Sequence, residues 1–504
     1  MWPCEFALGL AFSMAITSIV WFKRDLRVDD HEPLSLAVCQ GRVIPLYIVE
    51  PEFWHQPDTS YRQYQYLVTT LNELDSGLNL LGSRLIIRLG DAVEVLDSLV
   101  QTWGVTQMFS HQETGNNWTY ARDRRVQRWA KTRGVSWQES TQTGVVRRLK
   151  NRDGWSARWQ ATMQAPLVQR PHHIQSIPVD TQAMPSADAL GLMHDGYTTI
   201  QSGGSPMAHD TLATFLDNRA QPYARALSSP VTAYTHCSRL SSYLTLGAVS
   251  MRTVSQATQA RQVAIKQQAI GGEWRSAMRS FSGRLRWHCH FIQKLEDAPR
   301  IEFDNMHSAY NGLRENTFND AYFDAWKAGK TGFPMVDACM RALTATGWLN
   351  FRMRAMLMSV ASYHLWLHWR EPAVHLARLF VDYEPGIHYS QAQMQSGTTG
   401  INSVRIYNPI KQGVDHDPAG EFIRKWVPEL AQCPTEFIHM PWKNGYYRPP
   451  IVDEAQARQA AAAQVYALRK KTTHQEEAQA IVKQHGSRKR PRQSVKPDQL
   501  RLPI

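Results

Sequence analysis

The feature that most constrains the fold is a set of four short apolar runs near the start of the chain. They read AITSIVWF, RVIPLYIV, RLIIRLG and GVTQMFSHQ, and they are rich in β-branched residues. Segments that suit helices, such as DAVEVLDSLVQTWG, separate them. Buried strands that alternate with helices are typical of a parallel α/β sheet. The usual dinucleotide-binding G-x-G-x-x-G does not follow the first run.

The pattern changes after this region. From Arg147 to Met207 the chain is rich in Pro, Gln, Ser and Gly, which is typical of a long connector. In FPMVDACMRALTATGW, apolar residues then recur at helical spacing between Pro334 and Gly347. We expect a Rossmann-like α/β domain at 15–145, a connector at 146–204, an all-helical domain at 205–452, and a C-terminal helix with a basic tail at 453–504.

The charge balance favours a polyanionic partner. The chain has 56 Lys and Arg against 44 Asp and Glu, a net charge of +12, and a pI near 9.4. DNA is therefore an expected partner, although a solvated basic surface with one charged tail explains the same numbers. The block KQHGSRKRPRQSVK is most often such a tail, and phosphate binding is the alternative.

The cysteines and the apolar segments indicate the cellular setting. Six cysteines lie far apart without a C-x-x-C pair, so neither a metal site nor a disulfide framework is expected. We therefore expect a reducing, cytoplasmic (intracellular) location. The first 20 residues are apolar but lack a basic start, which favours an N-terminal extension, with Met14 as an alternative start, over a signal peptide. No other stretch is apolar enough for a membrane span.

Three stretches combine phosphate-type donors with aromatic and charged residues. In CSRLSSYLTLGAVSMR, Ser238, Arg239 and Ser241 form a candidate phosphate site before an apolar helix, although an ordinary helix cap is common in such a place. TGWLNFRMRAM and LFVDYEPG offer Arg354 and Asp382 as a buried ion pair, which is more often purely structural. RIYNPIKQGVDHDPAGEFIRKWVPEL reads as a tightly turned basic rim.

Together with VWFKRDLRVDDHEPLSLA, these stretches resemble the photolyase/cryptochrome family of FAD-binding proteins driven by blue light. The resemblance covers most of residues 18–465. It implies an α/β antenna domain, with a second chromophore of unknown identity, and a helical domain that folds FAD into a U-shape. In such proteins, excited reduced flavin donates an electron to a pyrimidine lesion in DNA, or light-driven flavin reduction drives signalling.

The resemblance also implies the residues that contact FAD. Cys237 stands where Thr is usual, and the Arg354–Asp382 pair would lie beside the isoalloxazine. His388 falls opposite flavin N5, where Asn or Asp is usual, and its titration range suits a proton donor; the alternative is a loop histidine with satisfied hydrogen bonds. The implied FAD contacts are Tyr223, Cys237, Ser238, Arg239, Leu240, Ser241, Phe281, His288, Arg354, Asp382, Glu384 and His388.

The lesion side departs from the family pattern. Arg284 replaces a carboxylate, and Phe351 stands where Asn or His is usual, so repair of cyclobutane dimers in duplex DNA is expected to be weak or absent. Trp287 and Trp348 match aromatic residues at the pocket mouth. The implied DNA and substrate contacts are Arg284, Trp287, Trp348, Phe351, Arg352 and Met394.

The family's tryptophan chain is interrupted. Trp369 matches its middle member, but the other positions fall near Ala392 and Asn316. Trp366 and Trp369 are three residues apart in a run that reads as helical, so we expect their rings on one helix face, although two core aromatics would show the same spacing. With His388, they are the candidate catalytic residues, and Tyr389 is a candidate bridge.

The sequence therefore predicts a monomeric, light-dependent flavoprotein that needs no metal. We expect a DNA photolyase-type lyase with a divergent lesion pocket. The alternative is a cryptochrome-like photoreceptor without repair activity. A relative that binds nucleic acid and has lost its flavin is a third reading, which the retained FAD residues disfavour.

Overall fold

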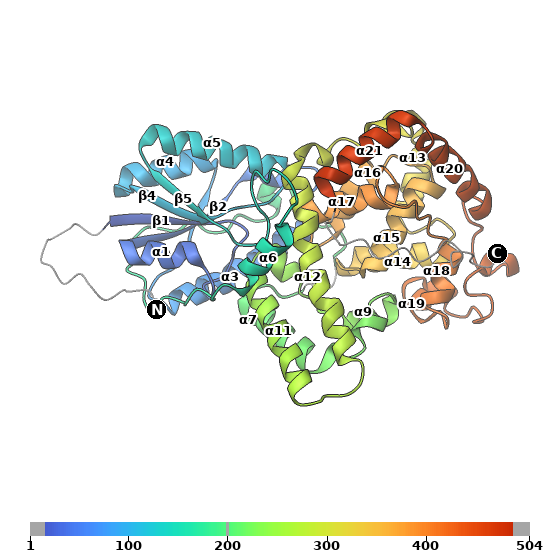
Figure 1. Cartoon of the computed structure of the whole chain (residues 1–504), viewed down its shortest axis with the longest axis horizontal. Coiled ribbons are helices and arrows are strands. Elements are labelled where there is room, and N and C mark those ends of the chain that lie inside the picture. The colour runs from blue at the N-terminus through green and yellow to red at the C-terminus, as the bar shows by residue number, and fades with distance from the viewer. Residues whose placement is uncertain (1–15, 198–200, 487–504) are drawn as a thin grey trace, which may run out of the picture.

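The computed structural model describes residues 16–197 and 201–486. Its first part is a five-stranded parallel sheet in the order β3-β2-β1-β4-β5, which lies on the left in Figure 1. This confirms the predicted α/β architecture. The strands are β1 (Ile16–Phe22), β2 (Gly41–Val49), β3 (Ile86–Leu89), β4 (Gln107–His111) and β5 (Ser136–Ser140).

Helices cover both faces of this sheet, which explains why its strands are almost continuously apolar. Val20 and Phe22 of β1 pack into one buried cluster, while Ile19 and Trp21 pack into another on the opposite face. Neighbouring strand residues point to opposite faces, so both halves of the strand are buried. The main helices here are α1 (Glu32–Gln40), α3 (Tyr61–Asn79), α4 (Ala92–Trp103) and α5 (Asn117–Arg133).

The segment between the sheet and the helical part is mostly irregular. It contains α6 (Trp155–Gln164) and the short turn η1 (Asp188–Leu190). Ile174 donates its backbone N–H to Leu81, and Ser176 bridges to Val43, so the segment packs back along the sheet. The proposed domain limits stay a prediction.

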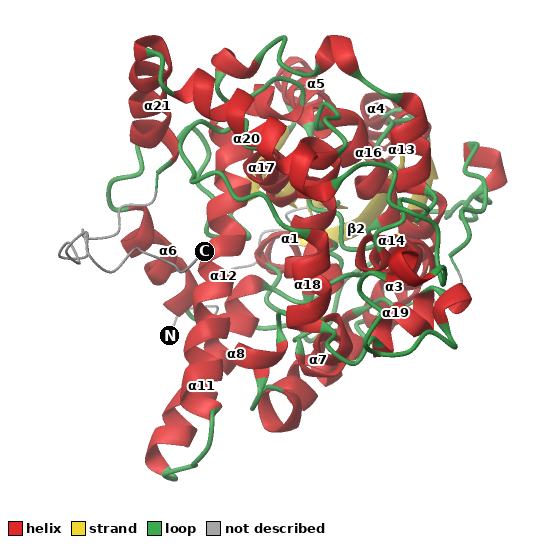
Figure 2. Ribbon diagram, turned by 90° about the vertical axis from the view of Figure 1, so that its right-hand side faces the viewer, coloured by secondary structure: helices red, strands yellow, loops and turns green. Residues whose placement is uncertain are grey.

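The rest of the described chain is helical (Figure 2). The predicted helix between Pro334 and Gly347 is confirmed as α14 (Pro334–Thr346), and Gly347 ends it with φ 68°. Its other longer helices are α7 (Ser205–Thr214), α11 (Met251–Gln267), α12 (Trp274–Asp297), α13 (Asp320–Lys327), α15 (Phe351–Ser359), α16 (Arg370–Leu379), α17 (Pro385–Ser396), α18 (Pro409–His416), α20 (Glu454–Arg469) and α21 (Thr472–His485).

Helices α12 and α17 come unusually close at Gly386. A Cβ atom at this position would lie 2.6 Å from Cα of Ile292 on α12. Because real Cβ atoms do not approach a backbone carbon so closely, only glycine allows this packing. The crossing fixes the distance between two walls of the cavity described below.

A helix does begin at Ser241, as expected, but α10 (Ser241–Thr245) is only five residues long. Another local expectation is wrong. The helix expected through Trp366 and Trp369 ends at Ser359 and continues as a π-helical turn, η6 (Val360–His364), after which Trp366 takes φ 53°. A left-handed residue cannot continue a right-handed helix, so the two tryptophans share no helix face.

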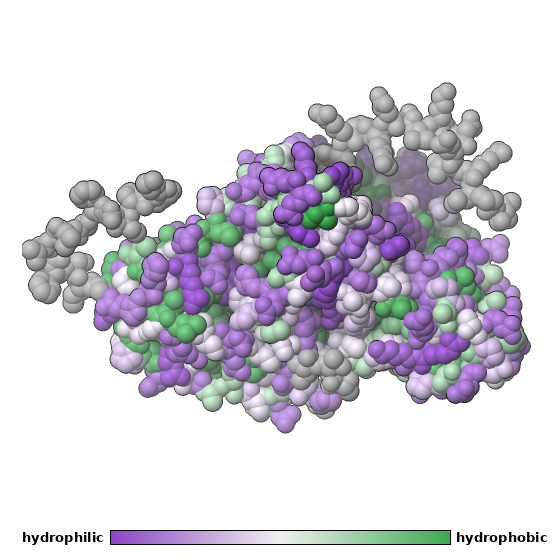
Figure 3. Space-filling model, turned by 90° about the horizontal axis from the view of Figure 1, so that it is seen from below, coloured by the Kyte–Doolittle hydropathy of each residue, from purple (hydrophilic) through white to green (hydrophobic). Residues whose placement is uncertain are grey.

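Among the described helices, none is both long and apolar enough to cross a bilayer. Figure 3 shows one face on which hydrophilic residues dominate and hydrophobic residues gather only in small groups. The residues before 16 and most of the basic C-terminal block lie outside the described residues.

Candidate functional site

The helical part contains a cavity with a volume of about 300 Å³. Its walls come from α12, α15, α17 and the segments around Ser238 and Asp382. These elements lie far apart in the sequence, so the cavity exists only in the folded helical domain. The predicted site residues that line it are Tyr223, Cys237, Ser238, Leu240, Ser241, Phe281, Arg284, His288, Trp348, Phe351, Arg354, Asp382, Glu384 and His388.

The other predicted residues lie outside this lining. Arg239 lies behind the wall, with its guanidinium carbon 4.0 Å from the ring centroid of Trp348. Arg352 lies 5.9 Å from the ring of Tyr407. Trp287, Met394, Trp366 and Trp369 are likewise not part of the lining.

The predicted ion pair is present. Arg354 Nη2 lies 2.8 Å from Asp382 Oδ2, and Arg354 Nε donates to the backbone oxygen of Leu349 at 2.6 Å. The guanidinium carbon lies 3.9 Å from the ring centroid of Phe380. The Asp382 side chain is only 3% exposed, so its charge needs a partner, and among the described residues Arg354 forms the ion pair with it.

The segment around Ser238 is held from behind by Arg219. Arg219 Nη1 donates to the backbone oxygen of Cys237 at 2.6 Å, and Nη2 donates to that of Ser238 at 3.3 Å. The following Arg239 has φ 62°, which turns the chain sharply. Burial raises the pKa of the Cys237 thiol to about 11, so this side chain stays protonated and uncharged.

Several polar atoms on the cavity wall lack a partner. In the described part of the chain, Asp382 Oδ1, Glu384 Oε1, His288 Nδ1, Asn350 Oδ1 and Gln391 Nε2 are buried without a hydrogen bond. Buried polar atoms are seldom left unpaired in native proteins, so this set is suited to a ligand that carries several donors and acceptors. The residues present therefore fit the FAD that the sequence implies.

Some wall residues escaped the sequence analysis. Asn350, Tyr383 and Gln391 line the cavity. Gln391 follows His388 by three residues on α17, and residues at this spacing lie on the same helix face. The spacing could therefore have indicated that Gln391 lies beside His388. No local pattern in the sequence indicated Arg24. It lies in the loop after β1, and its Nη2 atom is 2.6 Å from Oε2 of Glu384.

The geometry around His388 argues against a proton donor at neutral pH. Its Nε2 lies 2.7 Å from the backbone oxygen of Ala373, and a carbonyl can only accept, so Nε2 carries the ring proton. Burial lowers the pKa of His388 to about 4. The ring is then neutral, and Nδ1 has a lone pair to offer and no proton.

Arg284 on the cavity wall contacts two aromatic rings, those of Trp287 and Phe351. The Arg284 guanidinium carbon lies 5.1 Å from the ring centroid of Trp287 and 5.1 Å from that of Phe351. Trp287 is 42% exposed and Phe351 is 40% exposed, so both rings face solvent. Exposed aromatics beside a guanidinium suit a planar, negatively charged or base-containing partner.

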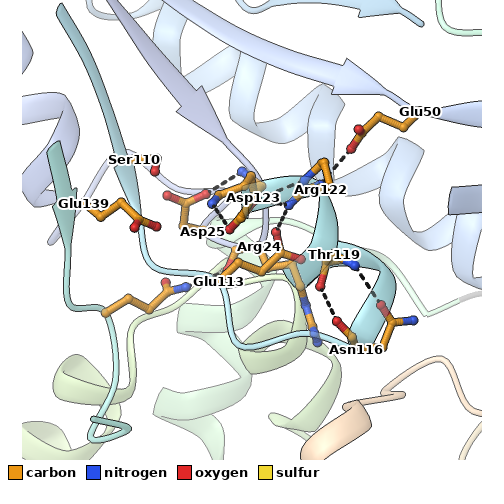
Figure 4. Close-up of polar contacts among 12 residues, drawn as sticks. Arg24, Asp25, Glu50, Ser110, Glu113, Asn116, Thr119, Arg122, Asp123 and Glu139 are labelled. Carbon is orange, nitrogen blue, oxygen red and sulfur yellow. Dashed lines mark hydrogen bonds and ion pairs between the residues drawn. The ribbon is translucent and has the colours of Figure 1, made fainter. Parts of the chain in front are cut away.

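A smaller cavity of about 110 Å³ lies at the carboxyl ends of the strands. Figure 4 shows the buried ion network on its wall, in which Arg122 contacts the carboxylates of Glu50, Glu113 and Asp123. Lys23 adds a second cation 3.0 Å from Asp123. Burial raises the pKa of Glu50 to about 7 despite Arg122, so this carboxyl is partly protonated near neutrality.

Asp25, His31 and His111 form a buried cluster of the composition that metal sites use. Asp25 Oδ2 lies 2.9 Å from His31 Nε2 and 2.8 Å from His111 Nδ1. His31 Nδ1 accepts the backbone N–H of Leu34, so Nε2 must carry the ring proton and donate it to Asp25. The His31 ring has no further lone pair for a metal, and the cluster reads as a structural hydrogen-bond network.

Comparison with known proteins gives consistent matches. A model of the FAD binding domain of DNA photolyase matches residues 281–467, and a DNA photolyase model matches residues 18–154. The deoxyribodipyrimidine photo-lyase of Escherichia coli is 28% identical over 488 residues, covering 90% of this chain and 99% of the relative. Cryptochrome-2 of Arabidopsis thaliana is 28% identical over 486 residues, covering 88% of this chain and 78% of the relative.

Solved structures agree with these matches. A bacterial class III photolyase from Agrobacterium tumefaciens has a TM-score of 0.80 at 25% identity, covering 93% of this chain and 100% of that chain. An archaeal photolyase from Sulfolobus tokodaii with two FAD molecules has a TM-score of 0.73 at 23% identity, covering 90% of this chain and 100% of that chain, and supports the fold. The chain belongs to the photolyase/cryptochrome family and has that family's FAD-binding domain.

Proposed function

We propose that this protein is a light-dependent DNA repair flavoenzyme that acts on a pyrimidine lesion with a divergent pocket. The observation that supports the proposal lies at the large cavity, where Arg284 contacts the exposed rings of both Trp287 and Phe351. A flipped, damaged base offers a flat face for stacking and oxygen atoms for a guanidinium. The net charge of +12 supports binding to the DNA backbone.

In this proposal, bound FAD supplies an electron to the lesion after it absorbs light. Residues of the cavity wall would hold the FAD. Arg354 is paired with Asp382, whose unpartnered Oδ1 would be available to a donor of the bound flavin, and Arg219 holds the backbone of the Ser238 segment at the cavity. Neutral His388 keeps a positive charge away from the ring.

Repair under blue light of DNA that carries defined lesions tests this proposal. We expect repair of cyclobutane dimers in duplex DNA to be weak, since Arg284 and Phe351 replace groups suited to hydrogen-bond that lesion. Another pyrimidine lesion, or single-stranded DNA, should be repaired better. Efficient repair of duplex cyclobutane dimers would overturn the expected lesion preference, and failure on every lesion would overturn the repair function.

A blue-light photoreceptor is the second candidate function. Arg284 favours it, because a cation stands where repair enzymes of the family usually have a carboxylate. The two candidates separate in one experiment, in which DNA binding and limited proteolysis are compared in darkness and blue light. A photoreceptor should change its proteolysis pattern with light and leave every lesion intact.

The smaller cavity is a candidate for a second chromophore. Within the described residues, Glu50 Oε1 and Asp58 Oδ1 are buried there without partners, which favours a ligand with N–H donors. The archaeal photolyase with two FAD molecules gives a precedent for two chromophores on this fold. Extraction of the purified protein with acid, followed by absorption and mass measurements, tests whether a second chromophore is present.

A further inference from the structure

Asp58 lies between the two cavities and holds two tyrosines of the helical part. It follows α2 (Pro51–Trp54), and it is 2% exposed. Its Oδ2 atom accepts a short hydrogen bond from the Tyr383 hydroxyl and a longer one, 3.3 Å, from the Tyr389 hydroxyl. The side-chain amide of Asn116 donates to the same oxygen at 3.3 Å.

These tyrosines adjoin the FAD cavity. Tyr383 lines it, and its ring centroid lies 5.3 Å from that of His388. The Tyr389 ring lies 6.3 Å from the Tyr383 ring and 6.3 Å from the Trp369 ring. Trp369, Tyr389 and Tyr383 therefore form an aromatic chain that ends at the cavity wall.

The chemistry of phenols gives Asp58 a specific role in this chain. A phenol that loses an electron becomes a strong acid, so its oxidation is easy only if a base takes the proton at once. Burial raises the pKa of both Tyr383 and Tyr389, which keeps each hydroxyl protonated beforehand. Among the described residues, Asp58 is the one carboxylate that accepts a hydrogen bond from either hydroxyl.

We propose that Asp58 is the proton acceptor for light-driven oxidation of Tyr383. In this step the Tyr383 O–H bond breaks, the proton moves to Asp58 Oδ2, and one electron would pass to the photoexcited isoalloxazine of bound FAD in its oxidised state. An external thiolate then gives one electron to the tyrosyl radical and becomes a thiyl radical, and Asp58 returns the proton to Tyr383. The proposal rests on the binding of FAD proposed above, but it concerns the light-driven reduction of oxidised FAD and requires neither DNA nor repair.

The placement of Asp58 also explains how its proton can exchange with water. Its second oxygen, Oδ1, has no hydrogen-bond partner in the described chain, and Asp58 is one of the residues that line the smaller cavity. When no second chromophore fills it, this cavity of about 110 Å³ has room for several water molecules, which can relay a proton from a polar wall. Tyr383 also lines this cavity, so it separates the two cavities.

Flash spectroscopy of the FAD-loaded protein tests the proposal. We expect a tyrosyl radical in wild type, with a slower rise in D₂O, and a loss of this radical in Tyr383→Phe. Asp58→Asn should lower its yield by roughly 100-fold, the effect of losing a general base. Asn116→Ser is the matched control, because it removes one partner of Asp58 but keeps both the base and the helix cap.

If a variant does not retain FAD, its radical cannot be measured, so a second measurement uses the flavin-free protein. Unfolding of the flavin-free protein is compared for Asp58→Asn, Tyr383→Phe and the double variant. We expect the double variant to lose less stability than the two single losses combined, because both remove the same hydrogen bond. Additive losses, or a wild-type radical yield in Asp58→Asn, would overturn the proposal. A normal radical with no repair of any lesion would count only against the repair function.

Discussion

The two cavities differ in whether their buried polar and charged atoms have partners within the protein. In the large cavity, polar atoms such as Asp382 Oδ1 and Gln391 Nε2 are buried without a partner in the described chain. In the small cavity, Arg122, Lys23 and their carboxylates mostly satisfy one another. This difference indicates that the polar atoms of the large cavity obtain their hydrogen-bond partners from the ligand. The charged groups of the small cavity are stabilised largely by their own ion pairs.

The largest effect is expected from breaking the small cavity's ion network. Arg122→Met leaves three carboxylates without their shared cation, and we expect a stability loss of roughly 3–5 kcal/mol in urea unfolding. Arg125→Met is the matched control on the same helix. Its pair with Asp91 is 42% and 28% exposed, so the expected loss is about 0–1 kcal/mol. Equal losses in the two variants would remove the contrast between the cavities.

A comparable effect is expected on flavin retention in the large cavity. Arg354→Ala strands Asp382, at a cost of roughly 3–5 kcal/mol, so the purified variant should lose its FAD or fold poorly. Arg352→Ala, on the same helix but outside the cavity lining, should keep FAD. The measurement is the flavin absorbance relative to the protein concentration. It is made on the purified protein and again after incubation with added FAD. A wild-type protein that stays colourless after FAD addition would contradict the argument.

An intermediate effect concerns pH. Because folding raises the pKa of Glu50 from 4.5 to about 7, its protonated form favours the folded state. Its contribution to stability is complete below pH 4.5, falls as the pH rises toward about 7, and then stays constant; the total change is at most roughly 3 kcal/mol.

Glu50→Gln should remove this component from the stability profile. Unfolding of wild type and variant is compared at several pH values on either side of the interval. A difference that does not vary with pH would show that the Glu50 carboxyl titrates in the folded protein as it does in the unfolded chain.

The smallest effect is expected on electron supply. Trp369→Phe should slow flavin photoreduction by an external reductant without stopping it, because Tyr383 and Tyr389 remain beside the cavity. Trp366→Phe should have little effect. Its ring lies 4.5 Å from the Arg314 guanidinium carbon, and the described structure shows no close ring contact with Trp369. A strong effect of Trp366→Phe, measured by absorbance under continuous blue light, would restore the relay expected from the sequence.

Local signals in the sequence predicted local structure well. Pro334 and Gly347 delimit α14 as expected, because a proline at the start and a left-handed glycine at the end act within one turn of the chain. The same reasoning failed at Trp366. Trp366 contacts Arg314, whose guanidinium carbon lies 4.5 Å from the Trp366 ring and 5.4 Å from the Tyr363 ring, and no spacing within the segment reveals these contacts.

The candidate site was predictable in part. The charges in TGWLNFRMRAM and LFVDYEPG suggested the Arg354–Asp382 pair, the family resemblance assigned it a place beside the flavin, and the structure contains the pair. The Arg24–Glu384 contact joins residues 360 positions apart, and Asp58 meets its tyrosines across more than 300 positions. Such contacts follow from the docking of the sheet against the helices, which periodicity and capping rules do not encode.

The close crossing at Gly386 has a consequence for how this cavity can change during evolution. Because backbone meets backbone there, the spacing of α12 and α17 does not depend on the side chains that line the cavity. Substitutions at His388, Gln391 or Gln395 can then alter the chemistry offered to a ligand while the width of the cavity is kept. A new function can be selected at these positions one residue at a time, whereas replacement of the single glycine would displace a whole wall.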